Sequence, residues 1–198
     1  MRVRTHRWVH RSLASLAAFS LLLGSAAWAD DADGGQSAVW AQKQFKFIYQ
    51  GFTTKYSCDG LHDKMRTILL QLGARKSDLK ISDWGCAGRS GVPDAFPGVA
   101  VKMSVLVPAN GGAASGGEPA LPSHWKAVTL KLDSSSLSEA GECELIEQVK
   151  QKVLPLFSTR NVDLKNTCVP HQLTPGGTLL TTDVLAPDQI PVNAADAH

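Results

Sequence analysis

Three polar side chains near residue 60 have the types and the spacing of a small cation site. Asp59, His62 and Asp63 lie at positions i, i+3 and i+4 of a segment with helical periodicity, so a helix would carry them on one side. Two carboxylates and an imidazole are ligands that divalent metal ions accept. The same residues also suit the solvated side of any amphipathic helix. A metal-binding protein or an enzyme with a site at these residues is therefore one of two hypotheses.

The sequence contains none of the motifs that mark a hydrolase or a redox catalyst. No Gly-x-Ser-x-Gly segment provides a nucleophile elbow, and neither His124 nor His171 has a neighbour that marks a catalytic triad. No Cys-x-x-Cys pair is present, which leaves no dithiol of the thioredoxin type. No sequence motif calls for a cofactor. The second hypothesis, which these observations favour, is a noncatalytic protein.

Export is indicated by the first 29 residues. Four arginines precede an apolar run from Leu13 to Leu23, and the small residues Ala27 and Ala29 fit a signal peptidase, so we expect cleavage before Asp30. The run is too short to cross a bilayer, which takes ~20 apolar residues. Four of the 20 basic residues and none of the 18 acidic residues lie in this leader. The mature chain then has a net charge of −2 and no electrostatic basis for binding nucleic acid. We expect it to be periplasmic or secreted, without membrane insertion.

The apolar pattern divides the exported chain into three parts. Residues 30–43 are predicted to be a flexible N-terminal segment, 44–168 a disulfide-stabilised α+β domain, and 169–198 a flexible tail rich in proline and glycine. Within the tail, residues 178–185 would add one edge strand. Alternation predicts strands at 45–49, 79–81, 99–107, 128–132 and 162–164, and three- and four-residue steps predict helices at 61–72 and 145–156. The first helix should end at Gly73 and pack its apolar stripe on the strands at 99–107 and 128–132.

The two helix-strand segments match one another without gaps. Six of 23 aligned positions are identical, where unrelated segments give about one or two. The identical pairs are Cys58 with Cys143, Leu69 with Leu154, Arg75 with Arg160, Asp78 with Asp163, Leu79 with Leu164 and Lys80 with Lys165. We interpret the match as an internal duplication, although any two amphipathic helices that each precede a strand share some residues.

These elements predict an α+β fold with two layers. Two duplicated α-β units would cover one mostly antiparallel sheet of four or five strands, a variant of the ferredoxin-like arrangement.

Four cysteines in an exported chain indicate disulfides, because thiols oxidise outside the cytoplasm. Three connectivities are allowed. The duplication favours Cys58 with Cys86 and Cys143 with Cys168, since each pair then brackets one α-β unit. The ends of two parallel strands joined by a helix also lie at one edge of a sheet. Crossed pairs of cysteines become possible if the strand at 99–107 and the segment 125–132 form a hairpin.

The segment around the first helix carries a distinctive motif. It consists of Tyr56-Ser57-Cys58-Asp59-Gly60-Leu61, Lys64-Met65-Arg66, Leu72-Gly73-Ala74-Arg75 and Trp84-Gly85-Cys86. With these runs the chain resembles, over residues 45–168, a group of uncharacterised exported bacterial proteins. The resemblance supports the pairing of Cys58 with Cys86 and brings no known activity. In physical terms, Ser57 or Asp59 would cap the first helix.

The sequence therefore favours an exported, noncatalytic envelope protein that binds a protein, a peptide or a glycan. The aromatic residues to examine as contacts are Phe52, Tyr56, Trp84 and Trp125, although aromatic side chains also serve the core of such a domain. A closed core beside an exposed aromatic patch would favour this hypothesis. A deep polar pocket with converging ionisable groups would favour the enzyme or metal carrier.

Overall fold

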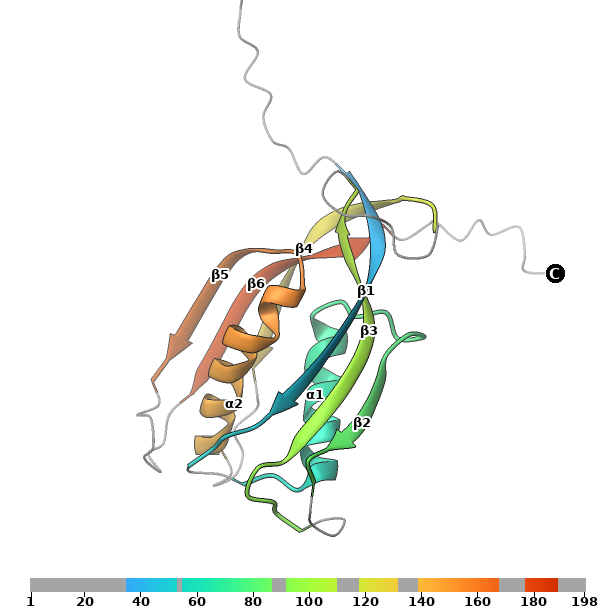
Figure 1. Cartoon of the computed structure of the whole chain (residues 1–198). Helices are drawn as coiled ribbons and strands as arrows, with labels where there is room; N and C mark the ends of the chain where they lie inside the picture. The colour runs from blue at the N-terminus through green and yellow to red at the C-terminus, as the bar shows by residue number, and fades with distance from the viewer. Residues whose placement is uncertain are drawn as a thin grey trace, which may run out of the picture. The chain divides into compact units, whose positions relative to one another are not determined.

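The computed structural model describes residues 35–52, 55–86, 92–109, 118–131, 139–167 and 177–188. In chain order, the elements of these residues are β1 (Gln36–Ile48), α1 (Cys58–Gln71), β2 (Lys80–Trp84), β3 (Gly98–Pro108), β4 (Leu121–Lys131), α2 (Glu139–Lys152), the 3-10 turn η1 (Leu154–Leu156), β5 (Thr159–Asn166) and β6 (Thr178–Pro187) (Figure 1). No helix in this part of the chain is long and apolar enough to cross a membrane.

The six strands of the described residues form one sheet in the order β2-β3-β1-β4-β6-β5, and every neighbouring pair is antiparallel. Both helices pack on this sheet through a single hydrophobic core, which confirms the α+β class. The predicted number of four or five strands is wrong. The sheet has six strands because the segment 178–187, expected at most at an edge, lies inside the sheet between β4 and β5.

The folded region extends beyond the predicted limits of 44 and 168 at both ends. β1 begins at Gln36, inside the segment predicted to be flexible (30–43), and buries Ala38 and Ala41. β6 lies inside the predicted tail (169–198) and buries Leu180 and Val184. Several inward positions of these two strands hold alanine in β1 and threonine in β6, so their hydrophobic alternation is weak. Pairing with neighbouring strands therefore determines their conformation more than hydrophobicity does.

The apolar stripe of α1 packs on the sheet as predicted. All of its residues are fully buried, in one cluster with the strand residues expected to face them. The stripe is Leu61, Met65, Ile68, Leu69 and Leu72, and the strand residues are Val101, Met103, Val105, Val128 and Leu130. α2 adds Leu145, Ile146 and Val149 to the same cluster.

Local sequence sets both ends of α1. The hydroxyl of Ser57, one of the two predicted caps, accepts a 3.1 Å hydrogen bond from the Gly60 N–H. At the other end, Gly73 has a φ of +94°, the left-handed conformation that glycine adopts most easily. The predicted stop is confirmed.

The chain passes through the same topology twice. One half consists of β1, α1, β2 and β3, the other of β4, α2, β5 and β6, and in each half the last strand lies between the first two. β1 and β2 are therefore parallel to one another, because both are antiparallel to β3. The halves meet where residues 36–38 pair with residues 121–123, and Figure 1 shows the two half-sheets spreading apart from this junction.

Candidate functional site

The segment that follows β1 is fixed to α2 by its backbone. Gln50 exchanges two hydrogen bonds with the Gln148 side chain: its N–H donates to Oε1 (3.2 Å) and its carbonyl oxygen accepts from Nε2 (2.9 Å). Two residues later, the Phe52 N–H donates to Glu144 Oε2 at 2.8 Å. The phenylalanine is nevertheless 74% exposed. Its ring is thus presented to solvent from an ordered backbone.

The carboxylate of Glu144 is itself held by a buried tyrosine. Tyr49 donates its hydroxyl proton to the same Oε2 atom at 3.2 Å. Burial first, and then the neighbouring Tyr56 and Glu144, raise the pKa of Tyr49 well above its ordinary value, so the hydroxyl keeps the proton that it donates. Gly51 leaves room for this contact, because a Cβ there would lie 2.0 Å from the Tyr49 hydroxyl oxygen.

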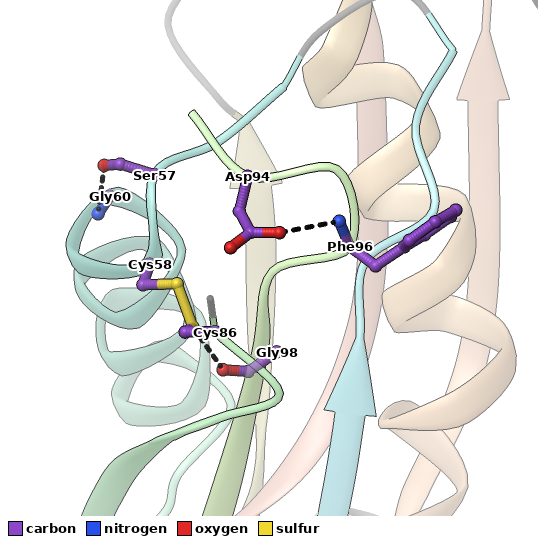
Figure 2. The surroundings of a disulfide bond; sticks show 7 residues. All are labelled: Ser57, Cys58, Gly60, Cys86, Asp94, Phe96 and Gly98. Atoms are coloured by element: carbon purple, nitrogen blue, oxygen red, sulfur yellow. Dashed lines mark hydrogen bonds between the residues drawn. A yellow bond between two sulfur atoms is a disulfide. The ribbon is translucent and has the colours of Figure 1, made fainter. Parts of the chain in front are cut away.

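The predicted Cys58–Cys86 disulfide is confirmed. It ties the start of α1 to the residues after β2, with the two Cα atoms 6.2 Å apart. The Cys86 sulfur also lies 3.6 Å from the carbonyl oxygen of Gly98 at the start of β3 (Figure 2). Gly98 has no room for a side chain, since a Cβ would lie 2.6 Å from the carbonyl oxygen of Trp84. The bridge and the close strand contact together fix the base of the loop before β3.

That loop presents a second phenylalanine. The Asp94 N–H donates to the Tyr56 carbonyl oxygen at 3.0 Å, and Asp94 Oδ1 accepts from the Phe96 N–H at 3.2 Å. The carbonyl oxygen of Pro97 accepts from the Tyr49 N–H at 3.0 Å. Figure 2 shows the Phe96 ring directed away from the disulfide, and the residue is 61% exposed. Phe96, like Phe52, is an exposed ring on a hydrogen-bonded backbone.

The two rings belong to one pocket. Phe52 and Phe96 line a hollow of about 600 Å³ against one side of α2. The remaining lining residues are polar, namely Gln50, Glu144, Glu147, Gln148, Gln151 and Lys152. We call this hollow the phenylalanine pocket. Phe52 was among the predicted contact residues, whereas Phe96 was not, although a large apolar residue between Pro93 and Pro97 in a loop was a signal for it.

The other predicted aromatic contacts lie in less exposed places. The ring of Tyr56 packs edge to face on Tyr49 with centroids 4.9 Å apart, and burial raises the pKa of Tyr56 above its ordinary value. Trp84 is the last residue of β2, and Lys46 Nζ lies 4.4 Å from the centroid of the Trp84 ring. Trp125 packs on a small second cluster of apolar residues on β1, β3 and β6. These three side chains are partly buried, and their role as contacts stays a prediction.

The predicted metal ligands do not form a metal site. Asp59, His62 and Asp63 line a shallow hollow of about 340 Å³ that also includes Asp83. His62 Nδ1 lies 3.2 Å from Asp63 Oδ1, and Asp63 has an 81% exposed side chain. Among the described residues, no three His, Cys, Asp or Glu side chains are placed to hold a metal ion. The arrangement is that of a solvated helix face.

The second predicted disulfide falls partly outside the described residues. Cys143 is buried and disulfide-bonded, while its predicted partner Cys168 lies beyond the described part of the chain, so this pairing stays a prediction. β3 and β4 do not pair with one another, because β1 lies between them in the sheet. The hairpin that would have favoured crossed bridges is therefore absent from the described strands. The Cys58–Cys86 bond indicates an oxidising, extracytoplasmic compartment.

Comparisons with protein-family models, with curated proteins and with solved structures found no match to this chain. The geometry of the phenylalanine pocket is thus the basis on which a function can be assigned.

Proposed function

We propose that this chain is an exported, noncatalytic protein of the cell envelope that binds a protein partner through the phenylalanine pocket. The observation that carries the proposal is the exposure of Phe52 and Phe96 on backbones that hydrogen bonds hold in place. A backbone that hydrogen bonds hold in place before binding loses little conformational entropy when it binds, which favours affinity. The disulfide at the base of the Phe96 loop adds to this preorganisation.

The composition of the pocket suits a peptide segment with an apolar side chain. Each aromatic ring buries roughly 150 to 250 Å² when it is covered, and rings of this kind dominate the binding energy of many interfaces. Gln151 and Lys152 at the rim offer groups that can hydrogen-bond the backbone of a partner. A closed core beside an exposed aromatic pair is the combination expected of a binding protein.

We also infer that the protein reaches the envelope by cleavage of its leader before Asp30. The disulfide supports this route, since such bonds persist outside the cytoplasm. The mature protein would be periplasmic or secreted.

We infer that the domain arose by duplication of one strand-helix-strand-strand unit, a split β-α-β motif of the kind found in ferredoxin-like folds. The step of 85 residues that takes Cys58 to Cys143 also takes Gln36, the first residue of β1, to Leu121, the first residue of β4. It further takes Trp40 to Trp125. These matches extend the correspondence to the strand before each helix, which the sequence alignment did not include.

Contacts that occur in both halves also support the duplication. Arg75 lies 5.2 Å from the Trp40 ring centroid and Arg160 lies 4.8 Å from that of Trp125, so the same pair occurs in both halves. The strand registers also correspond, because Trp40 pairs with Leu106 and Trp125 with Leu185. Descent from one duplicated unit accounts for both the shared strand register and the shared contact between arginine and tryptophan.

Photo-crosslinking in the cell envelope tests the binding function. A photoreactive phenylalanine analogue at position 96 should yield a discrete crosslinked protein, and the added substitution Phe52→Ser should abolish it. The matched control carries the analogue at Val162, which is 40% exposed on β5, away from the pocket. Equal products from both positions, or none from position 96, would contradict the proposal.

A further inference from the structure

The face of the sheet turned away from the helices carries a groove along β1, β3 and β2. Two adjoining hollows of about 280 and 570 Å³ share Gln44, Lys80 and Lys102 as lining residues, so they form one continuous depression. The strand registers place Gln44, Lys102 and Lys80 in one row across the sheet. Lys46 lies in the next row, opposite Ala100. We call this depression the lysine groove.

The lysine groove carries an excess of positive charge. Lys80 and Lys102 stand directly opposite one another on β2 and β3, an arrangement of like charges that destabilises a sheet. Within the described residues, neither lysine has a carboxylate at ion-pair distance, and the Lys46 ammonium lies over the ring of Trp84. A negatively charged ligand would offset this repulsion.

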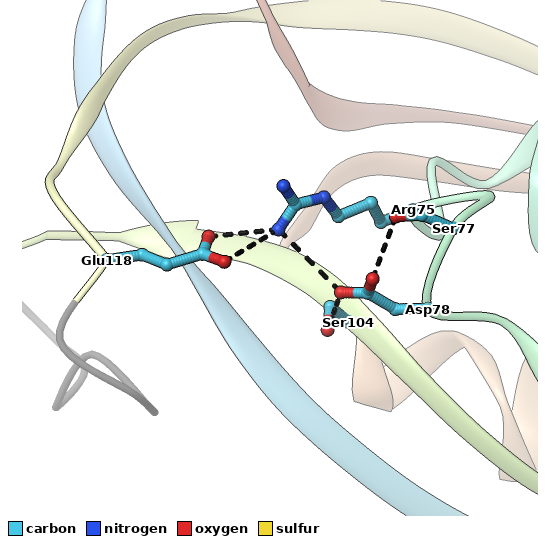
Figure 3. A network of polar contacts seen from close by, with 5 residues as sticks. All are labelled: Arg75, Ser77, Asp78, Ser104 and Glu118. Atoms are coloured by element: carbon cyan, nitrogen blue, oxygen red, sulfur yellow. Dashed lines mark hydrogen bonds and ion pairs between the residues drawn. The ribbon is translucent and has the colours of Figure 1, made fainter.

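The one carboxylate that lines the groove is already engaged. Asp78 accepts hydrogen bonds from Ser104 Oγ (2.7 Å) and Ser77 Oγ (2.8 Å), and its Oδ2 lies 3.7 Å from Arg75 Nη1 (Figure 3). Arg75 in turn pairs with Glu118 at 2.9 Å. The charge of Asp78 is thus shared between this network and the nearby Lys80, and it offsets only part of the charge of the lysines.

The second half of the domain repeats two of the three lysines, since the step of 85 residues takes Lys80 to Lys165 and Lys46 to Lys131. Lys102 differs between the halves. The runs Val105-Leu106-Val107-Pro108 and Val184-Leu185-Ala186-Pro187 place β3 and β6 in correspondence. By that correspondence, Thr181 occupies the position of Lys102 and Asp183 the position of Ser104. The same strand positions therefore tolerate a neutral and an acidic residue. The facing pair of lysines on β2 and β3 is therefore found in the first half, because the second half has Thr181 at the position of Lys102.

We infer that the lysine groove binds an acidic polysaccharide. The lysines supply charge, while Gln42, Gln44 and Ser82 supply amides and a hydroxyl that can hydrogen-bond sugar hydroxyl groups. A membrane surface fits less well, because interfacial binding also buries apolar side chains. None of the exposed large apolar residues of the described chain lines this groove. The groove is distinct from the phenylalanine pocket and has a separate ligand.

Calorimetric titration of the mature protein with acidic oligosaccharides tests the inference. The probes are hexameric oligogalacturonate, a heparin hexasaccharide, and neutral maltohexaose as the uncharged control. At least one acidic probe should bind, with an affinity that falls as salt is added, and maltohexaose should not. The double variant Lys80→Gln/Lys102→Gln should weaken binding at least tenfold.

The matched control is Lys55→Gln/Lys126→Gln, which removes the same charge from exposed positions outside the groove and should change affinity less than twofold. The variant Phe52→Ser/Phe96→Ser should bind the acidic probe as tightly as the unaltered protein. This result would separate the ligand of the lysine groove from the protein partner proposed for the phenylalanine pocket. Binding of neither acidic probe, or equal loss in both lysine variants, would overturn the inference. Binding to phosphatidylglycerol vesicles without binding to either oligosaccharide would overturn it in favour of a membrane.

Discussion

The backbone N–H of Phe52 donates a 2.8 Å hydrogen bond to the buried carboxylate of Glu144, a residue 92 positions later in the chain. The bond joins the segment after β1 in the first half to α2 in the second half. Tyr49 reinforces it by donating to the same oxygen atom. The backbone that carries the exposed ring of Phe52 is therefore held by a contact between the two halves of the domain.

Substitution of Gly51 should disrupt this arrangement. A Cβ at Gly51 would overlap the Tyr49 hydroxyl, so Gly51→Ala must displace the ring that holds Glu144. Overpacking of this kind costs ~1–3 kcal/mol, which thermal unfolding measures. Amide hydrogen exchange at Phe52 should accelerate in the same variant. Gly35→Ala is the control, because the closest atom to its Cβ would be 3.6 Å away. Equal stability of the two variants would show that the ring has room to move.

Truncation of the α1 stripe should destabilise the whole domain. Leu69 is fully buried, and a buried Leu→Ala change costs ~2–5 kcal/mol. Arg66→Ala, on the exposed side of the same helix, should change the unfolding free energy by about 0.5 kcal/mol or less. Lys64 is unsuitable as a control, because its ammonium lies 2.5 Å from the buried carboxylate of Glu142. Similar melting temperatures for the Leu69 and Arg66 variants would contradict the packing described.

The network around Asp78 predicts a pH effect with a defined sign. The Ser104 hydroxyl first, then the Ser77 hydroxyl and the nearby Arg75 and Lys80, lower the pKa of Asp78 below its ordinary value of 3.8. The stability that depends on this carboxylate is thus present above pH ~4 and is lost as the pH falls through the lowered pKa. Ser104→Ala should raise the pKa of Asp78 back towards 3.8, as followed by the NMR shift of its carboxyl carbon.

Ser82→Ala is the control for that titration. Its hydroxyl reaches the carbonyl oxygen of Ala100 and no carboxylate in the described residues. It should leave the titration of Asp78 unchanged. A pKa that stays low in Ser104→Ala would show that Ser77 and the neighbouring cations Arg75 and Lys80 are sufficient to lower it.

The sequence predicted correctly the elements in which apolar and polar residues alternate clearly. The stripe of α1, its cap at Ser57 and its end at Gly73 follow from short-range patterns that tertiary packing preserves. β6 was harder to place, because its alternation relies on threonine and its flanking prolines and glycines also suit a tail. Pairing on both sides, with β4 and β5, decides its conformation.

The candidate site was predictable only in part. Phe52 was named among aromatic contacts, and the disulfide followed from the duplicated pattern. The position of Phe96 beside it depends on contacts between distant segments, such as the hydrogen bond from the Tyr49 N–H to the Pro97 carbonyl oxygen. Glu144 also gave no signal, because a glutamate on an amphipathic helix normally faces solvent, whereas here it accepts bonds in the interior.

The second disulfide can be tested in exported protein. Nonreducing protease digestion with mass spectrometry should recover one fragment joining the Cys58 and Cys86 peptides and another joining those of Cys143 and Cys168. The double variant Cys58→Ser/Cys86→Ser should lose ~2–4 kcal/mol of stability, because the unfolded chain is no longer constrained. A fragment joining Cys58 to Cys143 would refute the pairing within each half.

The central claim is that Phe52 and Phe96 together bind a protein. Its most direct test is calorimetric titration of the partner identified by crosslinking at position 96 against the purified mature domain. Phe52→Ser/Phe96→Ser should raise the dissociation constant at least tenfold while leaving the melting temperature nearly unchanged, because both rings are exposed. Val162→Ser should bind as tightly as the unaltered protein. Equal affinity of the double phenylalanine variant and the unaltered protein would contradict the claim.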